Sequence, residues 1–211
     1  MRIVTVAQMK QIEKNADESG VSYLQMMENA GTAAYRAICA APLNCQSIAI
    51  VAGKGNNGGD GFVIARLAAQ EGKQVRVILA EGQPVTADAK TNFDRLTGLP
   101  VHICTLDETD SLAPADVVVD ALYGTGFHGA LRPSGEKACR LMNTSGAYVA
   151  ALDLPSGTAA DTGVAAEGAV KAQLTIAFDS YKQVHVSEAA KPYCGKLVLA
   201  DIGVPEHCHP R

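Results

Sequence analysis

The chain carries two kinds of hydrophobic pattern, one with the spacing of amphipathic helices and one with the short continuous apolar runs of buried strands. Thr5 and Gln8 have capping-box spacing ahead of a first helix that ends at Gly20, and Ser22 begins a second helix. After these two helices, strands and helices alternate. We expect strands at residues 47–52, 75–79, 101–104, 116–121, 148–152, 173–178 and 196–199, and helices at 61–71, 87–96 and 135–142.

This alternation is typical of a parallel sheet connected by helices. Residues 48–52 and 117–119 are uninterrupted apolar runs, as expected for strands buried on both faces. We therefore predict that residues 1–211 form a single α/β domain. Its mostly parallel sheet would be the middle layer of a three-layer α/β/α sandwich, preceded by two N-terminal helices.

Composition and charge exclude several classes of protein. Hydrophobic residues make up 47% of the chain and charged residues 19%, which suits a protein with a sizeable core and excludes global disorder. The net charge of −4 lacks the basic surplus typical of nucleic-acid binders. No apolar run approaches the roughly 20 residues that a membrane span needs. Since the first residues also lack the pattern of a signal peptide, we predict a cytoplasmic protein without a membrane or nucleic-acid partner.

Cysteine usage agrees with a reducing compartment. The six cysteines form no CxxC pair, so we expect reduced thiols rather than disulfides. Residues 207–209, His-Cys-His, have metal-ligating side chains, but they lie at the end of the chain, where we expect fraying, and we assign them no function.

In a parallel sheet, ligands bind beyond the carboxyl ends of the strands, so the segments that follow the strands are the first place to look for a site. Residues 53–61 contain the spacing GxGxxG at Gly53, Gly55 and Gly58. Glycines allow a phosphate or ribose to approach the backbone, and the helix that follows offers free N–H groups. Asp60 is a candidate helix cap.

Two further strands are followed by carboxylates. Asp120 precedes a second glycine-rich loop, in which His128 is either a general acid–base group or a solvated loop histidine. Asp153 precedes a stiff Pro-Ser-Gly turn that contains Ser156. Asn57, Asp120 and Ser156 would meet at the same edge of the sheet as oxygen donors, a set that suits a hard cation better than zinc.

Residues 24–31, 53–61, 120–129, 153–157 and 200–205 together resemble, in order, the YjeF N-terminal domain family, whose best-known members are NAD(P)H-hydrate epimerases. The resemblance implies a Rossmann-like domain that dimerises and binds one potassium ion per subunit at Asn57, Asp120 and Ser156. It assigns to the hydrated cofactor Asn56, Asn57, Gly58, Gly59, Asp60, Gly124, Thr125, Gly126, Phe127, His128, Gly129, Ala130, Asp153 and Lys182.

The implied activity is interconversion of the R and S epimers of hydrated NADH and NADPH, NAD(P)HX. The hydrate is a hemiaminal, so the ring nitrogen can expel the hydroxyl and water can return to the other face of the iminium. This exchange needs a group that gives and takes a proton, and Asp153 is our candidate. Ring opening and reclosure is an alternative route. The functional partner would be an ADP- or ATP-dependent NAD(P)HX dehydratase, separate or fused.

Two other functions stay open at the sequence level. GxGxxG after a strand, with Glu81 after the next one, is also the pattern of an NAD-dependent dehydrogenase. A non-catalytic dimerising scaffold is the second alternative, although it would not require both Asp120 and Asp153.

The leading helices carry more apolar residues than an outer layer needs. These include Met9, Ile12, Met26 and Met27, and we predict that some of them pack in an interface between two subunits.

Overall fold

The fold is centred on one sheet of seven parallel strands in the order β3-β2-β1-β4-β5-β6-β7. The computed structural model describes residues 1–210. The strands are β1 Ser47–Ala52, β2 Gln74–Leu79, β3 Val101–Thr105, β4 Val117–Ala121, β5 Tyr148–Leu152, β6 Leu174–Phe178 and β7 Lys196–Ala200. The helices are α1 Val6–Glu18, α2 Tyr23–Cys39, α3 Asn56–Gln70, α4 Ala87–Asp94, α5 Pro133–Asn143, α6 Gln183–Val186, α7 Lys191–Cys194 and the 3-10 helix η1 Glu206–Cys208.

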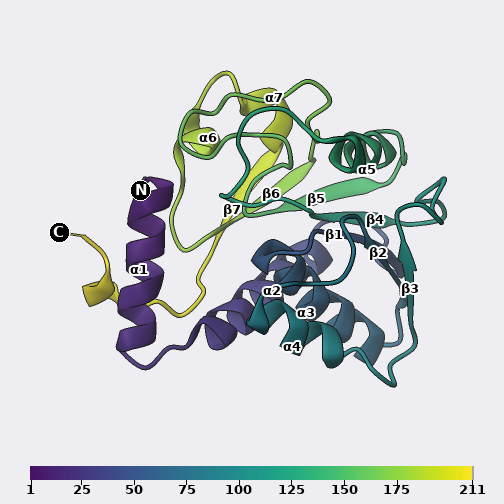
Figure 1. Ribbon diagram of the computed structural model, residues 1–211, viewed down its shortest axis with the longest axis horizontal. Helices are drawn as coiled ribbons and strands as arrows, with labels where there is room; N and C mark the ends of the chain where they lie inside the picture. The colour runs from purple at the N-terminus through teal and green to yellow at the C-terminus, as the bar shows by residue number, and fades with distance from the viewer. Residues whose placement is uncertain (211) are drawn as a thin grey trace.

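Helices cover both faces of the sheet, which confirms the three-layer prediction. Figure 1 shows α2, α3 and α4 on one side and α5 on the other. A hydrophobic core lies on each face of the sheet, and alternate residues of β1 pack into one or the other. Ile48 and Ile50 pack in the core that contains Phe62 of α3, whereas Ala49 and Val51 pack in the core that contains Met142 of α5. Because each strand is buried on both faces, its sequence is a continuous apolar run.

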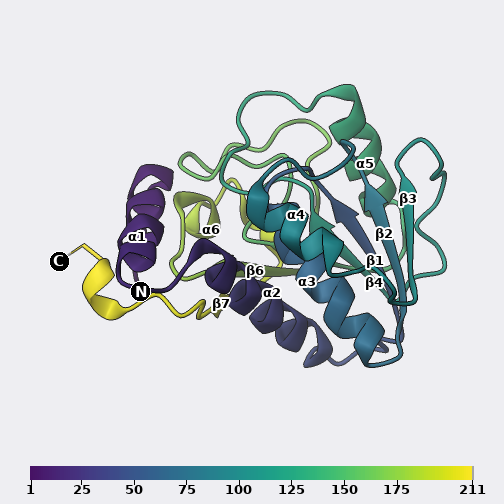
Figure 2. The same cartoon turned by 60° about the horizontal axis from the view of Figure 1, so that its bottom comes forward.

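The first helix begins as its sequence predicts. Thr5 caps α1 and forms the capping box with Gln8, and Ser22 caps α2. Figure 2 shows α1 at one end of the molecule, beside the C-terminal segment. There the Asn15 side chain donates a hydrogen bond to the Cys208 carbonyl, and Arg2 pairs with Glu206.

Several sequence predictions need correction. The helices α6 and α7 between β6 and β7 were not predicted. The chain end is not frayed at residues 208–209, because Cys208 is buried and His209 Nε2 lies 3.0 Å from Asp179 Oδ1.

The proposed basis for a dimer interface is also wrong. Met9, Ile12, Met26 and Met27 retain 1–6% of their exposure and are buried within the single chain. The helices need these residues for their own packing, so they cannot form a surface between subunits.

The cysteine prediction is confirmed, since all six are free thiols. Among residues 1–210, the helices are too short or too polar to cross a bilayer.

Candidate active site

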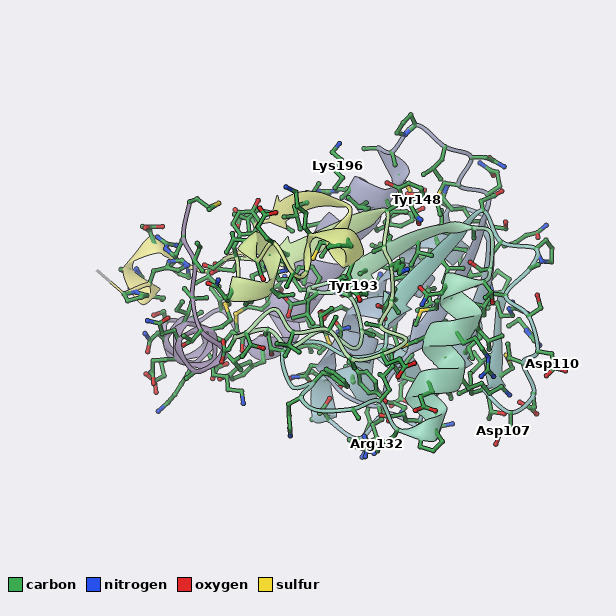
Figure 3. All side chains as sticks on the ribbon, turned by 90° about the horizontal axis from the view of Figure 1, so that it is seen from above. Asp107, Asp110, Arg132, Tyr148, Tyr193 and Lys196 are labelled. Carbon is green, nitrogen blue, oxygen red and sulfur yellow. The ribbon has the colours of Figure 1, made fainter. Side chains whose placement is uncertain are left out.

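A cleft of about 630 Å³ lies at the carboxyl edge of the sheet. It is lined by the segments that follow β1, β2, β4, β5 and β6, and by one face of α1. Arg132, which precedes α5, lies at the rim of the cleft. Tyr148 and Lys196 are the first residues of β5 and β7 and therefore mark the opposite, amino edge of the sheet. Figure 3 shows Arg132 across the molecule from these two residues. The cleft is therefore located where parallel α/β sheets bind ligands.

The glycine-rich segment after β1 is mostly helix rather than loop. α3 begins at Asn56, and its glycines allow close packing. A Cβ on Gly58 would lie 2.0 Å from the Gly53 carbonyl oxygen, and one on Gly59 would lie 2.5 Å from Sδ of Met27. Neither glycine lines the cleft, whereas Asn56, Asn57 and Asp60 do.

Asp60 is not a helix cap, so that prediction is wrong. The N-cap of α3 is Gly55, and Asp60 lies inside the helix. Its side chain lines the cleft but is only 8% exposed, and burial, with Asp153 and Glu13 nearby, raises its pKa well above the usual value. Burial therefore disfavours the ionised form of Asp60 where it faces the cleft.

The second glycine-rich loop, after β4, forms another part of the cleft. Gly124, Thr125, Gly126, Phe127, His128 and Ala130 line it, and Gly129 does not. The loop is attached to the rim, because Tyr123 donates a 2.8 Å hydrogen bond to Glu81 and its ring stacks on Phe127. His128 is exposed, as a solvated loop histidine would be.

Asp153, the first residue after β5, has the left-handed backbone conformation, with φ 62°. Non-glycine residues rarely adopt it, and it costs of the order of 1–3 kcal/mol. Three contacts hold it. Its N–H donates to the Ile176 carbonyl at 2.8 Å, its own carbonyl accepts from His185 Nε2 at 2.6 Å, and its Oδ1 accepts from Lys182 Nζ at 2.7 Å.

Lys182 is buried rather than exposed at the surface, as most lysines are. It is 1% exposed, and besides Asp153 its Nζ contacts the Phe178 carbonyl at 3.0 Å. A buried ammonium group needs such partners, and the ion pair with Asp153 supplies the charge.

His185 links these two residues, and sequence reasoning missed it. Its Nδ1 accepts from the Lys182 backbone N–H at 2.9 Å, so the proton is on Nε2, which donates to the Asp153 carbonyl. Burial lowers the pKa of His185, which favours this neutral form. Its only sequence signal is its position three residues after Lys182, at the first turn of α6.

Asp120 and Ser156 form a buried polar centre behind the cleft. Asp120 is fully buried, and its carboxylate accepts from the Ser156 N–H at 2.7 Å, the Ser156 hydroxyl at 2.6 Å and the Leu122 N–H at 3.2 Å. Burial raises the pKa of Asp120 to about 6. Within residues 1–210 no Lys, Arg or His side chain pairs with it, so its charge has no compensating cation from the chain.

Asn57, in the first turn of α3, lies beside Gly124 of the loop after β4. A Cβ on Gly124 would lie 3.5 Å from its Cγ, and its Nδ2 is buried with no partner in the described part of the chain. The Tyr123 carbonyl adds an oxygen 3.4 Å from the Ser156 hydroxyl. The structure therefore brings together oxygen donors that fit a hard monovalent cation, and residues 1–210 contain no cluster of His, Cys, Asp and Glu suited to a transition metal.

Glu13 of α1 is a further cleft residue that sequence reasoning missed. It is half-buried, lines the cleft together with Met9 and Lys10, and accepts no hydrogen bond from residues 1–210. No local pattern indicates Glu13, because α1 reaches the cleft only through the tertiary fold.

Known proteins are similar to this chain in sequence and in fold. The family described as YjeF-related protein N-terminus matches residues 23–184. The NAD(P)H-hydrate epimerase of Pirellula staleyi is 37% identical over 88% of this chain and 85% of its own length. The bifunctional NAD(P)H-hydrate repair enzyme Nnr of Pyrobaculum aerophilum is 38% identical over 97% of this chain and 42% of its own length, and that of Coxiella burnetii is 39% identical over 94% and 41%.

The chain thus spans about two fifths of the bifunctional relatives. The crystal structure of yeast YNL200c has the same fold, with a TM-score of 0.76, 23% identity, and coverage of 88% of this chain and 84% of the yeast chain. The sequence match over most of the chain, on this seven-stranded sheet, shows that the protein belongs to the YjeF-related N-terminal domain family.

Proposed function

We propose that this protein is an NAD(P)H-hydrate epimerase, which interconverts the R and S forms of hydrated NADH and NADPH. The observation that carries the proposal is the buried Lys182–Asp153 pair facing a cleft between two glycine-rich segments. Asp153 makes this pair from a left-handed backbone conformation, and backbone strain of this kind concentrates at functional sites. The 37% identity to the Pirellula staleyi epimerase, over most of both chains, supports the same activity.

The chain's own groups suit this chemistry. Lys182 Nζ donates to Oδ1 of Asp153, and no donor within residues 1–210 contacts Oδ2. That oxygen is thus available to take a proton from water or to return one to the hydroxyl on the ring carbon. His185 and the Ile176 carbonyl hold the Asp153 backbone, so the carboxylate is positioned before substrate binds.

The remaining lining residues would bind the rest of the cofactor. We assign Asn56, Asn57 and Asp60 at the start of α3, and residues 124–128 and 130 after β4, to the nucleotide. Gly58 and Gly59 act indirectly, since they let α3 pack close to Gly53 and Met27.

We also propose one potassium ion per subunit at Asn57, Asp120 and Ser156. The buried carboxylate of Asp120, which pairs with no cationic side chain of residues 1–210, supports this assignment together with the Ser156 hydroxyl beside it. A bound cation would neutralise Asp120 and hold the loops after β4 and β5 in their places.

Two associations extend the proposal. The product would be consumed by an ADP- or ATP-dependent dehydratase, in agreement with the bifunctional repair enzymes that the chain matches. A homodimer would have twice the 22.0 kDa mass of the chain, which light scattering measures directly.

The test is chiral chromatography of one isolated hydrate epimer incubated with the protein. We expect the other epimer to appear faster than in a blank without protein, because the reaction also occurs spontaneously. Equal rates would reject the activity. Binding without turnover would favour the scaffold function, whereas oxidation of intact NADH with an added carbonyl substrate would favour a dehydrogenase.

A further inference from the structure

We propose that Glu13 is a second proton-transfer residue of the site, acting with Asp153 during epimerisation. This inference rests on the proposed function. Inversion requires water to leave one face of the dihydronicotinamide ring and to return to the other. A single carboxylate beside one face is poorly placed to handle protons on both, so a second group that reaches the cleft from a different element is expected.

Glu13 has the required position. It lines the same cleft as Asp153 but comes from α1, which lies outside the helix layers on the sheet, whereas Asp153 follows β5 (Figure 2). Its carboxyl group accepts no hydrogen bond from residues 1–210, so no structural role occupies it. The α1 helix is fixed in place by its capping box and by the contacts of Asn15 and Arg2 with the chain end.

The two carboxyl groups have different environments. Lys182 pairs directly with Asp153 and not with Glu13. Burial, and then the charge of Asp153, raises the pKa of Glu13 from 4.5 to about 7. Several charged or titratable groups interact electrostatically with Glu13. One is on α1 itself, and the others are on α2, on α3 and in the segments after β5 and β6: Lys10, Tyr23, Asp60, Asp153, Asp179 and Lys182.

These environments assign the acid and the base. Protonated Glu13 gives its proton to the hydroxyl oxygen as the carbon–oxygen bond breaks, and the nitrogen lone pair forms the iminium double bond. Water then adds to the opposite face, its proton passes to Asp153, and the electron pair returns to nitrogen. One proton has moved from Glu13 to Asp153, and no redox partner is needed. The opposite epimer reacts when Asp153 is protonated and Glu13 is ionised, and the same steps then run in reverse.

The experiment compares wild type with Glu13→Gln at pH 5.5–9, always above the spontaneous rate. Glu18→Gln is the matched control, because Glu18 is on the same helix with its side chain 63% exposed. We expect Glu13→Gln to slow epimerisation by ~10²-fold or more at saturating substrate. We expect the wild-type rate to decline as pH rises through about 7, and we expect Glu13→Gln to lack this decline. Affinity for intact NADH should change little.

Thermal melts separate this role from a structural one. Because the folded state disfavours ionised Glu13, Glu13→Gln should melt at a higher temperature than wild type at pH 8, and this gain should disappear at pH 4.5. A structural role predicts a lower melting temperature at both pH values.

Each remaining outcome is decisive. If wild type is active and Glu13→Gln keeps its rate and pH profile, or if only Asp60→Asn removes the decline near pH 7, this inference is overturned and the epimerase activity stands. If wild type does not exceed the blank, the proposed function fails and this inference fails with it.

Discussion

Asp153 shows how the site depends on contacts that no local pattern encodes. Its importance follows from its position directly after a buried strand, and Lys182 follows from the family resemblance. Neither argument finds His185 or Glu13. His185 contacts Asp153 only because the chain after β6 returns as α6, and Glu13 reaches the cleft only because α1 docks beside the chain end. These are long-range consequences of the fold, with sequence separations that periodicity cannot bridge.

The buried, neutral His185 predicts a specific pH dependence of stability. Its folded-state pKa lies below the usual 6.5, so the unfolded chain binds more protons as pH falls. The free energy of unfolding should therefore decrease on acidification below about 6.5, by at most about 1.4 kcal/mol per pH unit from this residue. His185→Gln keeps a donor but cannot be protonated.

Urea unfolding of wild type and His185→Gln at pH 8 and pH 5.5 measures this contribution. The comparison must be between the two proteins, because the raised pKa of Glu13 changes stability in the opposite direction with pH. We expect the loss of stability on acidification to be smaller in the variant. An equal loss in both would mean that His185 is not held neutral in the folded state.

At the scale of elements, the spacing of hydrophobic residues and the capping residues predict where most helices and strands begin and end, but they do not predict the start of α3. Glycine has a low helix propensity, so the glycine-rich segment after β1 is expected to be a loop through residue 60. In the structure, Gly58 and Gly61 allow backbone and side-chain approaches that no other residue would allow, and tertiary packing overrides propensity. Asp60 consequently faces the cleft from inside a helix.

Gly58→Ala tests this packing. The added Cβ would lie 2.0 Å from the Gly53 carbonyl oxygen, so α3 would have to move away from β1. We expect a loss of more than about 2 kcal/mol in the free energy of unfolding, the range of severe overpacking.

Gly55→Ala is the matched control for this variant. A Cβ there meets nothing within 4 Å, and losing a glycine N-cap costs at most about 1 kcal/mol. Similar unfolding curves for the two variants would show that Gly58 is not under steric constraint.

For the whole molecule, the topology explains where the cleft forms. β1 lies between β2 and β4, and the chain leaves β1 through α3 on one face and leaves β4 through α5 on the other. The segments after β1 and β4 therefore diverge and leave a crevice between them. The sequence predicts this location because parallel sheets bind ligands beyond the carboxyl ends of their strands, but it does not predict that α1 forms one wall of the cleft.

The buried Asp120 centre predicts that potassium stabilises the folded protein. Binding to the folded state alone should raise the free energy of unfolding by about 2.7 kcal/mol at a concentration 100 times the dissociation constant. Potassium chloride should therefore raise the melting temperature above that in choline chloride at equal ionic strength, and Asp120→Asn should abolish the difference. Identical melting curves for wild type in the two salts would contradict the site.

The most direct test of the account is the epimerisation rate of Asp153→Asn, measured by chiral chromatography from one isolated hydrate epimer and corrected for the spontaneous rate. The variant keeps the size and most hydrogen bonds of the side chain but cannot accept a proton. We predict a rate at saturating substrate ~10²–10⁴-fold below wild type, with substrate still bound. Asp107→Asn, on the exposed loop after β3, should retain the wild-type rate. A wild-type rate for Asp153→Asn would contradict the account, because the proton transfer would then belong to another group.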